Sequence, residues 1–279
     1  MISCQSDSAV SKLWQTLFDD RSVHPKRPLR SLKSLKLRNN ALSDVAIHPI
    51  LQHCPDLERL DLSFTSIRRL PKLSTVPPIK KLNLTSTFIS GAEIAEMVMQ
   101  LPKLKKLAIG AMGIQSGSTK AVANSTAMTL DDGALYRLTE ALHECPLIEN
   151  ISLVQNTKLG TTRRQESSLA HFIQKIGRKC EVSHHVVISY FVYFVLICTQ
   201  TLNMSGIPYL HSEDLTGICP QDGTNFVSPL KALLLNKTGI DDSVAPWLAS
   251  CTALEVLEVA ETKMSGMYCD RCSRNLCAC

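Results

Sequence analysis

The sequence predicts a curved α/β solenoid, with short parallel strands on its concave face and helices and loops on its convex face. The first observation is a repeated apolar pattern, LxxLxLxxTxI, which residues 57–67 illustrate. The second is the spacing of the copies, which start about 22 to 25 residues apart in the first part of the chain. A unit of this length is one strand and one return segment, and it buries its apolar face only by stacking on its neighbours.

Seven copies of the pattern are clear, and they begin at residues 32, 57, 79, 104, 148, 230 and 254. We count positions from the first apolar residue of a copy, so that Leu57 is position 1, Leu60 position 4 and Leu62 position 6. These apolar positions are expected in the core, and the positions between them on the concave surface. The copies at 104 and 148 lie further apart than the others, which indicates that residues 110–128, rich in Gly, Ser, Thr and Ala, form an inserted loop.

Helix signals follow several of the expected strands. Ser90-Gly-Ala-Glu93 is a capping box ahead of an apolar pattern with helical spacing. A second helix is expected after Asp131 and a third after Asp241, because Asp is a favoured N-cap residue. All three helices are expected on the convex side of the solenoid.

The repeats divide the chain into three parts. Residues 1–31 are expected to form an N-terminal cap or linker, residues 32–265 the repeat array, and residues 266–279 a cysteine-rich tail without order. The array is expected to lack the polar capping unit that normally covers the end of a solenoid.

The tail contains four thiols, enough for a structural zinc ion, at Cys269, Cys272, Cys277 and Cys279. Thiolate sites usually separate their two pairs by about a dozen residues or more, so that a loop wraps the ion. The two pairs here are much closer, and we predict no metal site. Read-through of the gene is an alternative origin for this segment.

Composition restricts the possible function classes. The net charge of +5 and the sequence pI of about 8.6 are well below the usual excess of a nucleic-acid-binding domain, so no nucleic acid is expected as partner. The first residues do not resemble a secretory leader, and we expect a cytoplasmic or nuclear protein with free thiols. Cys54, Cys145 and Cys251 each precede a repeat, at a place where a small apolar residue is expected to be buried.

Residues 182–200 interrupt the array with the sequence VSHHVVISYFVYFVLICTQ, and three interpretations compete. A transmembrane helix needs about 20 apolar residues, and this run is shorter and rich in β-branched residues, so no membrane contact is predicted. A buried strand is possible, because Val, Ile, Tyr and Phe favour strands. The third interpretation is a retained intron.

The codons that can encode this segment favour the retained-intron interpretation over the other two. Glu181-Val182-Ser183 can be encoded by a splice-donor consensus, and the apolar run implies pyrimidine-rich codons that end in Thr-Gln, which an acceptor can encode. Removing residues 182–200 keeps the reading frame and joins Glu181 to Thr201. The junction reads C-x-x-L-x-M, which restores a repeat strand.

Cations concentrate at the outward positions of the first four repeats, and carboxylates at those of the last repeat, where Glu255, Glu258 and Glu261 occur. Strands stack about 4.8 Å apart, so these side chains are expected to form a basic field and a separate acidic patch. Solubility alone is the alternative explanation, because a strand surface must be polar. The residues predicted to bind an acidic partner are Lys33, Lys36, Arg38, Arg59, Lys80, Lys81, Lys105 and Lys106.

The repeat resembles the leucine-rich-repeat superfamily over roughly residues 30–265. The segments HCPDLERLDLSFTSI, ECPLIENISLVQN and SCTALEVLEV are similar to the cysteine-containing repeats of its ribonuclease-inhibitor-like class, in which C-P-x-L precedes the strand. The resemblance implies a protein-binding scaffold, and many proteins with this repeat are F-box substrate receptors of ubiquitin ligases. No F-box helices are recognisable in residues 1–31.

Enzyme motifs are not recognisable in the sequence. It has no nucleophile elbow, zinc-protease motif, P-loop or dinucleotide-binding glycine pattern, and we predict no catalytic residue and no cofactor. The sequence therefore predicts a non-enzymatic scaffold that binds a protein partner on its concave face. The alternatives are a substrate-recognition subunit that joins ubiquitin-ligase components, and a role linked to nucleic acid or nucleotides through the basic face.

Overall fold

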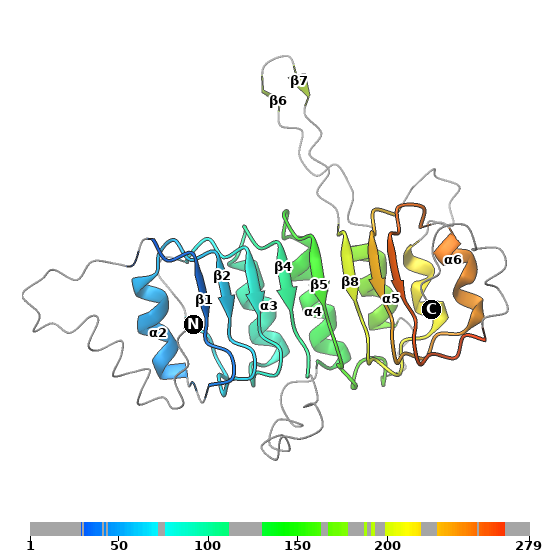
Figure 1. Cartoon of the computed structure of the whole chain (residues 1–279), viewed down its shortest axis with the longest axis horizontal. Coiled ribbons are helices and arrows are strands. Elements are labelled where there is room, and N and C mark those ends of the chain that lie inside the picture. Colours follow the sequence, from blue (N-terminus) through cyan, green and yellow to red (C-terminus); the bar gives the residue numbers. More distant parts are fainter. Residues whose placement is uncertain are drawn as a thin grey trace, which may run out of the picture.

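Eight short parallel strands form one open sheet in the computed structural model (Figure 1). The model describes residues 29, 31–40, 42, 44–71, 76–111, 130–162, 167–177, 187–188, 191–192, 199–218, 228–249 and 251–265. The sheet has the order β1-β2-β3-β4-β5-β8-β9-β10. Its strands are β1 Ser34–Lys36, β2 Arg59–Asp61, β3 Lys81–Asn83, β4 Lys106–Ala108, β5 Asn150–Ser152, β8 Thr201–Asn203, β9 Ala232–Leu234 and β10 Val256–Glu258.

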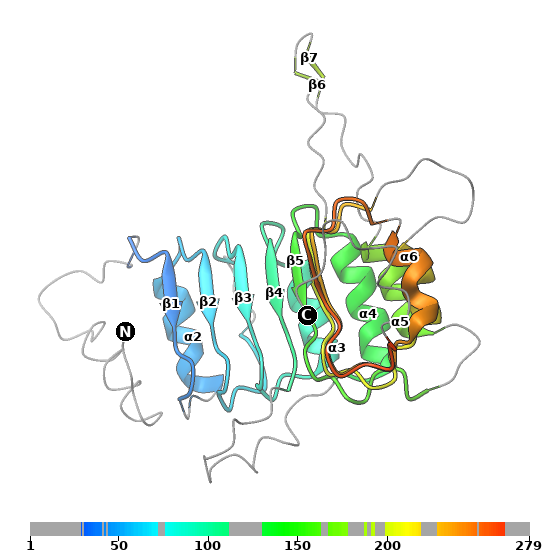
Figure 2. The same cartoon turned by 45° about the vertical axis from the view of Figure 1, so that its right-hand side comes forward.

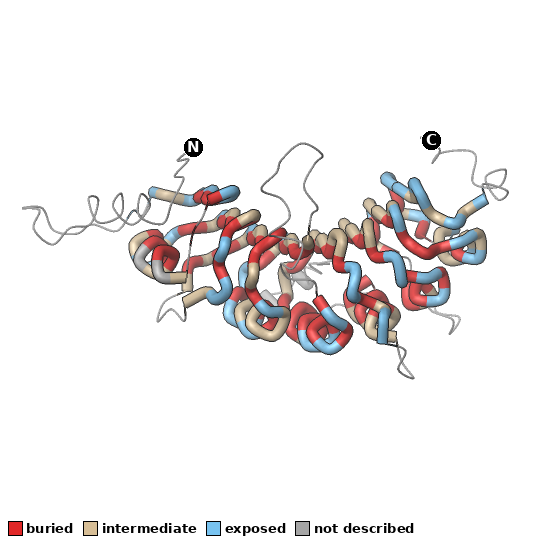
Figure 3. The backbone as a smooth tube through the Cα atoms, turned by 90° about the horizontal axis from the view of Figure 1, so that it is seen from below, coloured by how far each residue is buried: buried red, intermediate tan, exposed pale blue. Residues whose placement is uncertain are grey.

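Helices cover one face of this sheet only (Figure 2). Viewed along the strands, the chain forms an arc with the sheet on its inner side and the helices on its outer side (Figure 3). The predicted leucine-rich-repeat α/β solenoid is therefore confirmed. The helical elements are α2 Asp44–His53, α3 Gly91–Met99, α4 Asp132–His143, α5 Ser168–Phe172, η2 Ile173–Gly177, η3 Ser212–Ile218, η4 Asp242–Val244 and α6 Ala245–Ala249.

The core consists of the apolar positions of the repeat. Neighbouring strands are in register, so that Leu60 lies beside Leu82 and Leu82 beside Leu107. These three side chains are each 2% exposed, and position-6 residues such as Leu62 and Leu84 are fully buried. The sequence pattern therefore identified the buried face correctly.

A polar residue at position 9 supports the turn after the strand in six of the repeats. The side chain of Asn40 donates to the carbonyl of Leu37 at 2.9 Å, and the hydroxyl of Thr65 donates to the carbonyl of Leu62 at 2.7 Å. Thr87, Asn156, Thr238 and Thr262 make the same bond to the carbonyl three residues earlier. Because a buried carbonyl without a partner is costly, this bond explains why a polar residue recurs inside an apolar pattern.

The predicted helix starts are found, with one difference. Ser90 and Glu93 form the capping box of α3, and Asp131 caps α4 by accepting from the N–H of Ala134 at 2.7 Å. The third helix begins as a 3-10 turn, η4, and continues as the short α6. The elements α5, η2 and η3 were not predicted, although α5 begins at an N-cap, Ser167, whose hydroxyl accepts from the N–H of Ala170 at 3.3 Å.

Buried cysteines precede three of the strands, as predicted. Cys54 is fully buried, and Cys145 and Cys251 are each 3% exposed. None of the three is in a disulfide among the described residues, and burial raises the pKa of Cys54 to about 11. A thiol that stays protonated is a poor nucleophile, so Cys54 is a packing residue.

Aspartates at the start of helical elements bind the backbone of a following return segment. Asp44 accepts from the N–H groups of Arg68 and Arg69, at 2.6 and 3.0 Å. Asp242 accepts from the N–H of Ser265 at 2.9 Å. These bonds hold each return segment against the next, which the repeat pattern alone did not indicate.

Asp132 has the most extensive set of these contacts. Its carboxylate accepts from the N–H of Gly160 at 2.7 Å, from the N–H of Thr162 at 2.8 Å and from the hydroxyl of Ser168 at 2.5 Å. Burial alone raises the pKa of Asp132, but the hydrogen bonds from Ser168, Gly160 and Thr162 outweigh it and hold the pKa below its usual value.

Four described residues of the interrupting segment form strands that are not part of the array. Strand β6, Val187–Ile188, pairs antiparallel with β7, Phe191–Val192, in a separate two-stranded sheet. The main sheet passes directly from β5 to β8. The retained-intron interpretation stays a prediction, and most of the segment lies outside the described residues.

The array resumes at Thr199, which fits its position poorly. Thr199 is fully buried at position 1, where the seven recognised copies have Leu or Ile. Among the described residues its hydroxyl has no hydrogen-bond partner. Joining Glu181 to Thr201 instead places Cys180 at position 1, a residue type that the core of this chain already buries.

The remaining predicted segments lie largely outside the described residues. They are the N-terminal cap, of which only Leu29 and Ser31 are described, the loop after Ala111 and the cysteine-rich tail. No helix among the described residues is long and apolar enough to cross a membrane.

Truncating a position-6 leucine should strongly destabilise the array. We expect Leu84→Ala to lower the free energy of unfolding by about 2–5 kcal/mol, through lost burial and the cavity that remains. Chemical denaturation followed by circular dichroism measures this. The control is Glu96→Ala on the exposed face of α3, expected within about 0.5 kcal/mol of the parent. Equal effects of the two substitutions would show that the core assignment is wrong.

Losing the carboxylate of Asp132 should also destabilise the protein. We expect Asp132→Asn to cost about 1–3 kcal/mol, because the amide cannot accept all three hydrogen bonds. The folded pKa is lowered, so this stabilisation is present above the unfolded value of about 3.9 and is lost as pH falls through the folded pKa.

Thermal unfolding at neutral and acid pH tests both statements. The difference between the parent and Asp132→Asn should shrink as pH falls. Asp131→Asn is the matched control, because Asn and Asp are similar N-caps. A difference that stays constant down to low pH would contradict the assignment.

Removing residues 182–200 should leave the array folded and more stable. We expect a gain of about 1–3 kcal/mol, because an unpaired buried hydroxyl is replaced by a thiol suited to the core. Thr199→Val in the full chain is the matched substitution and should raise the melting temperature in the same direction. A deletion variant that fails to fold would show that the segment is integral. Sequencing the transcript across codons 181–201 tests the intron interpretation itself.

Candidate functional site

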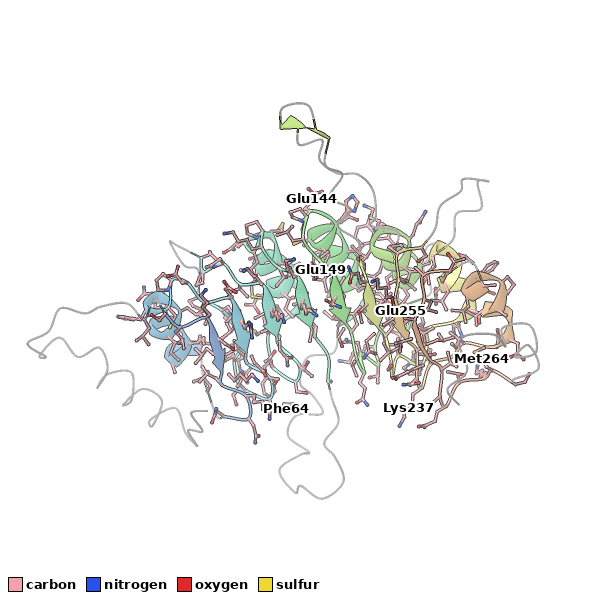
Figure 4. The ribbon with its side chains drawn as sticks, turned by 45° about the horizontal axis from the view of Figure 1, so that its top comes forward. Phe64, Glu144, Glu149, Lys237, Glu255 and Met264 are labelled. Carbon is pink, nitrogen blue, oxygen red and sulfur yellow. The ribbon has the colours of Figure 1, made fainter. Side chains whose placement is uncertain are left out.

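The in-register sheet arranges outward side chains into rows that cross the strands. The position-2 row borders the end where the strands begin, and the position-3 and position-5 rows cover the strands themselves. Residues at position 8 lie where the strands end, and Figure 4 shows Phe64 and Lys237 there, opposite Glu149 and Glu255 of position 2. Seven of the eight predicted cations therefore belong to one of these rows, and Arg38, at position 7, does not.

The position-2 row alternates in charge over much of its length. Lys80 Nζ lies 3.1 Å from Glu58 Oε1, and Lys105 Nζ lies 2.6 Å from Glu149 Oε1. Backbone bonds that follow the sheet bring Lys33 beside Glu58 in the same row. Three of the predicted binding cations, Lys33, Lys80 and Lys105, are thus partly neutralised by neighbours within the chain.

The ionisation of Glu58 reflects this surrounding. The hydrogen bond from Lys80 lowers the pKa of Glu58, partial burial opposes this, and the charges of Lys80, Lys33 and Arg59 lower it further. Glu58 therefore carries a full negative charge at neutral pH, inside the predicted basic field.

The position-3 row is different, because three cations follow one another. Arg59 lies in register with Lys81, and Lys81 with Lys106, on strands β2, β3 and β4. All three side chains are exposed. Among the described residues, Lys81 and Lys106 form no ion pair. Neighbouring strands are about 4.8 Å apart, so this row concentrates positive charge, and the described residues leave Lys81 and Lys106 without an ion pair.

The position-5 row carries hydrogen-bonding groups held by their own turns. Asp61 Oδ1 accepts from the N–H and the hydroxyl of Ser63, at 3.1 and 2.7 Å. Asn83 and Asn203 each accept from the N–H two residues later, at 3.1 Å. Lys36 is exposed at the start of this row, in register with Asp61.

The rows line a shallow groove of about 590 Å³ along the concave face. Of the eight predicted residues, Lys36, Arg59, Lys81 and Lys106 line it. Lys33, Lys80 and Lys105 belong to the bordering row, and Arg38 is exposed in the turn after β1. The structure therefore brings half of the predicted residues together in one groove.

The groove changes in character along its length. It is basic over β2 to β4, neutral and polar over β5 and β8, and apolar where Leu234 lines it. Sequence analysis missed the neutral stretch, which consists of Asn150, Ser152, Thr201 and Asn203. The first two were recognisable as positions 3 and 5 of the copy at residue 148. The last two were obscured by the interrupting segment.

Smaller depressions lie outside the concave groove. One, of about 410 Å³, lies beside α3 and contains the pair Arg69–Glu93, at 3.0 Å. Another, of about 110 Å³, is lined by Asp132, Tyr136 and His171, and the rings of Tyr136 and His171 stack with their centroids 4.5 Å apart. Nε2 of His171 is 2.8 Å from Glu140. Within the described part of the chain, no group of three or more metal-binding side chains occurs.

Comparison with known proteins found only distant similarity to solved structures. No protein-family model matches the chain, and no curated protein is similar enough to match it. The chain is similar to the crystal structure of the mouse RP105/MD-1 complex, with a TM-score of 0.31, 12% identity, and coverage of 84% of this chain and 43% of that one. It is also similar to the crystal structure of an internalin from Listeria monocytogenes, with a TM-score of 0.25, 12% identity, and coverage of 94% and 91%.

This chain spans less than half of the chain that it matches in the RP105/MD-1 complex. Identities and TM-scores this low carry no argument about this chain. Any functional conclusion has to come from the surface of the chain itself.

Proposed function

We propose that the chain is a non-enzymatic protein-interaction scaffold that binds an acidic segment of a partner protein along its concave groove. The observation that carries this proposal is the row Arg59, Lys81 and Lys106, exposed on three consecutive strands and lining the groove. Charges that the fold leaves uncompensated side by side raise the local positive potential and speed encounter with acidic surfaces.

The shape of the groove supports an extended occupant. It is open along the inner side of the arc, and its lining comes from seven neighbouring strands, β1 to β5, β8 and β9. A partner segment that crosses the strands meets lysine and arginine first and then the amides and hydroxyls of β5 and β8. We infer that acidic residues of the partner lie over β2 to β4 and uncharged polar residues over β5 and β8.

The ribonuclease-inhibitor-like subclass is part of this proposal. Cys54, Cys145 and Cys251 support it, because each is buried three residues before position 1 of its repeat. Substrate recognition for a ubiquitin ligase stays an alternative prediction. Recovery of a cullin–adaptor complex with the full chain would support it.

Charge reversal in the position-3 row should weaken binding without unfolding the array. The probe is a fluorescent deca-glutamate peptide, with binding followed by anisotropy at low salt and at about 0.15 M salt, where screening acts over about 8 Å. We expect Lys81→Glu/Lys106→Glu to reduce affinity about tenfold or more, since like charges then face each other. The loss should appear mainly in the association rate.

The matched control is Lys103→Glu/Lys158→Glu, which makes the same change in net charge at exposed lysines that do not line the groove. It should bind nearly as well as the parent. Equal loss in both variants would show that only net charge matters and that the groove is not the site. Tighter binding of a single-stranded oligonucleotide, with a steep salt dependence, would favour the nucleic-acid alternative instead.

A further inference from the structure

The concave face becomes apolar at β9, beyond the neutral stretch of the groove. The outward residues of this strand are Ala232 and Leu234, both only partly buried, and Leu234 lines the groove. Val256 lies in register with Ala232 on β10 and is 45% exposed. Strand β9 pairs with β8 on one side and with β10 on the other, so Leu234 lies on the face of the sheet and not at its edge. We call the surface of Ala232, Leu234 and Val256 the apolar end.

The apolar end differs from the rest of the concave face. Among the strands that the structure describes, Leu234 and Val256 are the two large apolar side chains at positions 3 and 5. They lie diagonally across neighbouring strands, a separation of about 7–8 Å that one bound side chain spans. A single exposed apolar residue needs no explanation. Adjacent ones that continue a polar groove are typical of a place where a ligand buries an apolar group.

We propose that the partner segment carries one large apolar side chain, an anchor, which packs on Leu234 while the acidic residues of the segment lie over β2 to β4. This inference rests on the proposed function. It adds the residue type that the groove selects at its far end, and the distance of that residue from the acidic run. The groove is lined continuously from β2 to β9, so one extended segment reaches both parts.

The order of the strands sets the spacing between the acidic run and the anchor. Strand β9 follows β4 by three steps across the sheet, through β5 and β8. At about 4.8 Å for each step this is about 14 Å, and an extended chain covers about 3.4 Å per residue. The anchor is therefore about four residues from the acidic residue that lies over Lys106. This spacing holds for either direction of the bound segment.

The charge beside the apolar end favours an uncharged occupant there. Glu258 lies in register with Leu234 on the next strand, and it accepts a hydrogen bond from the amide of Asn236 at 2.6 Å. Among the described residues Glu258 forms no ion pair. An acidic run that continued beyond β8 would approach this carboxylate and be repelled. An apolar side chain avoids that repulsion, and it gains by removing its own surface and that of Leu234 from water.

Fluorescent peptides that differ only in the anchor test this inference. The leucine probe has six glutamates, a spacer of three Gly and Ser residues and then Leu, and the alanine probe has Ala in place of Leu. Both have blocked ends, and both are also made in reversed order. We expect the leucine probe to bind the full chain about five- to tenfold more tightly in at least one order, because Leu buries more apolar surface than Ala. Anisotropy at about 0.15 M salt measures both affinities.

Leu234→Asn should remove the preference for the leucine probe. Asn suits this strand position, because Asn203 occupies it on β8. The two probes should then bind equally, and the affinity for the alanine probe should stay within about twofold of the parent, because that probe has no anchor to lose. Met99→Asn is the matched control, since Met99 is 62% exposed on α3, outside the groove, and this variant should keep the full preference.

Lys81→Glu/Lys106→Glu should weaken both probes by the same factor and keep their ratio, which separates the anchor from the charged row. Probes that bind the parent equally well would overturn the anchor and leave the proposed function standing. If neither probe binds the parent, the proposed function and this inference are both wrong. A preference that survives Leu234→Asn would also overturn the inference. So would self-association of the parent that this substitution abolishes, because a second copy would then be the occupant.

Discussion

In-register stacking of the apolar repeat positions is the constraint on which the rest of this structure depends. Leu60, Leu82 and Leu107 lie side by side on three successive strands and are almost completely buried. A strand of three residues has little stability alone, so each repeat folds only against its neighbours. The Asn or Thr at position 9 completes this arrangement by satisfying a carbonyl that the turn leaves inside the core.

The same register creates the surface that we associate with function. Neighbouring strands are in register, so residues at the same repeat position lie side by side. The neighbours of a charged residue are therefore the residues at the same position on the two adjacent strands. At position 2 each lysine has a glutamate on a neighbouring repeat that partly neutralises it, as in Lys105 and Glu149. At position 3 there is no such glutamate, and Arg59, Lys81 and Lys106 remain as one positive row. The distribution of charge therefore follows from the packing of the core.

A solenoid also accommodates interruptions, because each repeat contacts only the next. The sheet passes from β5 to β8 in register although residues 182–198 intervene in the sequence. The interruption disturbs the core only locally, at Thr199. The hydroxyl of this residue is buried at position 1, where the other repeats have Leu or Ile. Sequence analysis recognised the interruption from its composition. The sequence indicated the next strand, β8, only when the interrupting segment was removed and the repeat pattern was restored.

The sequence by itself determined the fold class, the core positions, the helix starts at Ser90 and Asp131, and the burial of Cys54. These depend on local periodicity and capping, which neighbouring residues encode. Only the tertiary structure decided which of the eight predicted cations lie together and which pair with a glutamate, because Lys105 and its partner Glu149 are 44 residues apart. It also revealed the contacts of Asp132 with a later return segment. Such contacts depend on which repeat stacks on which, and no local pattern specifies that.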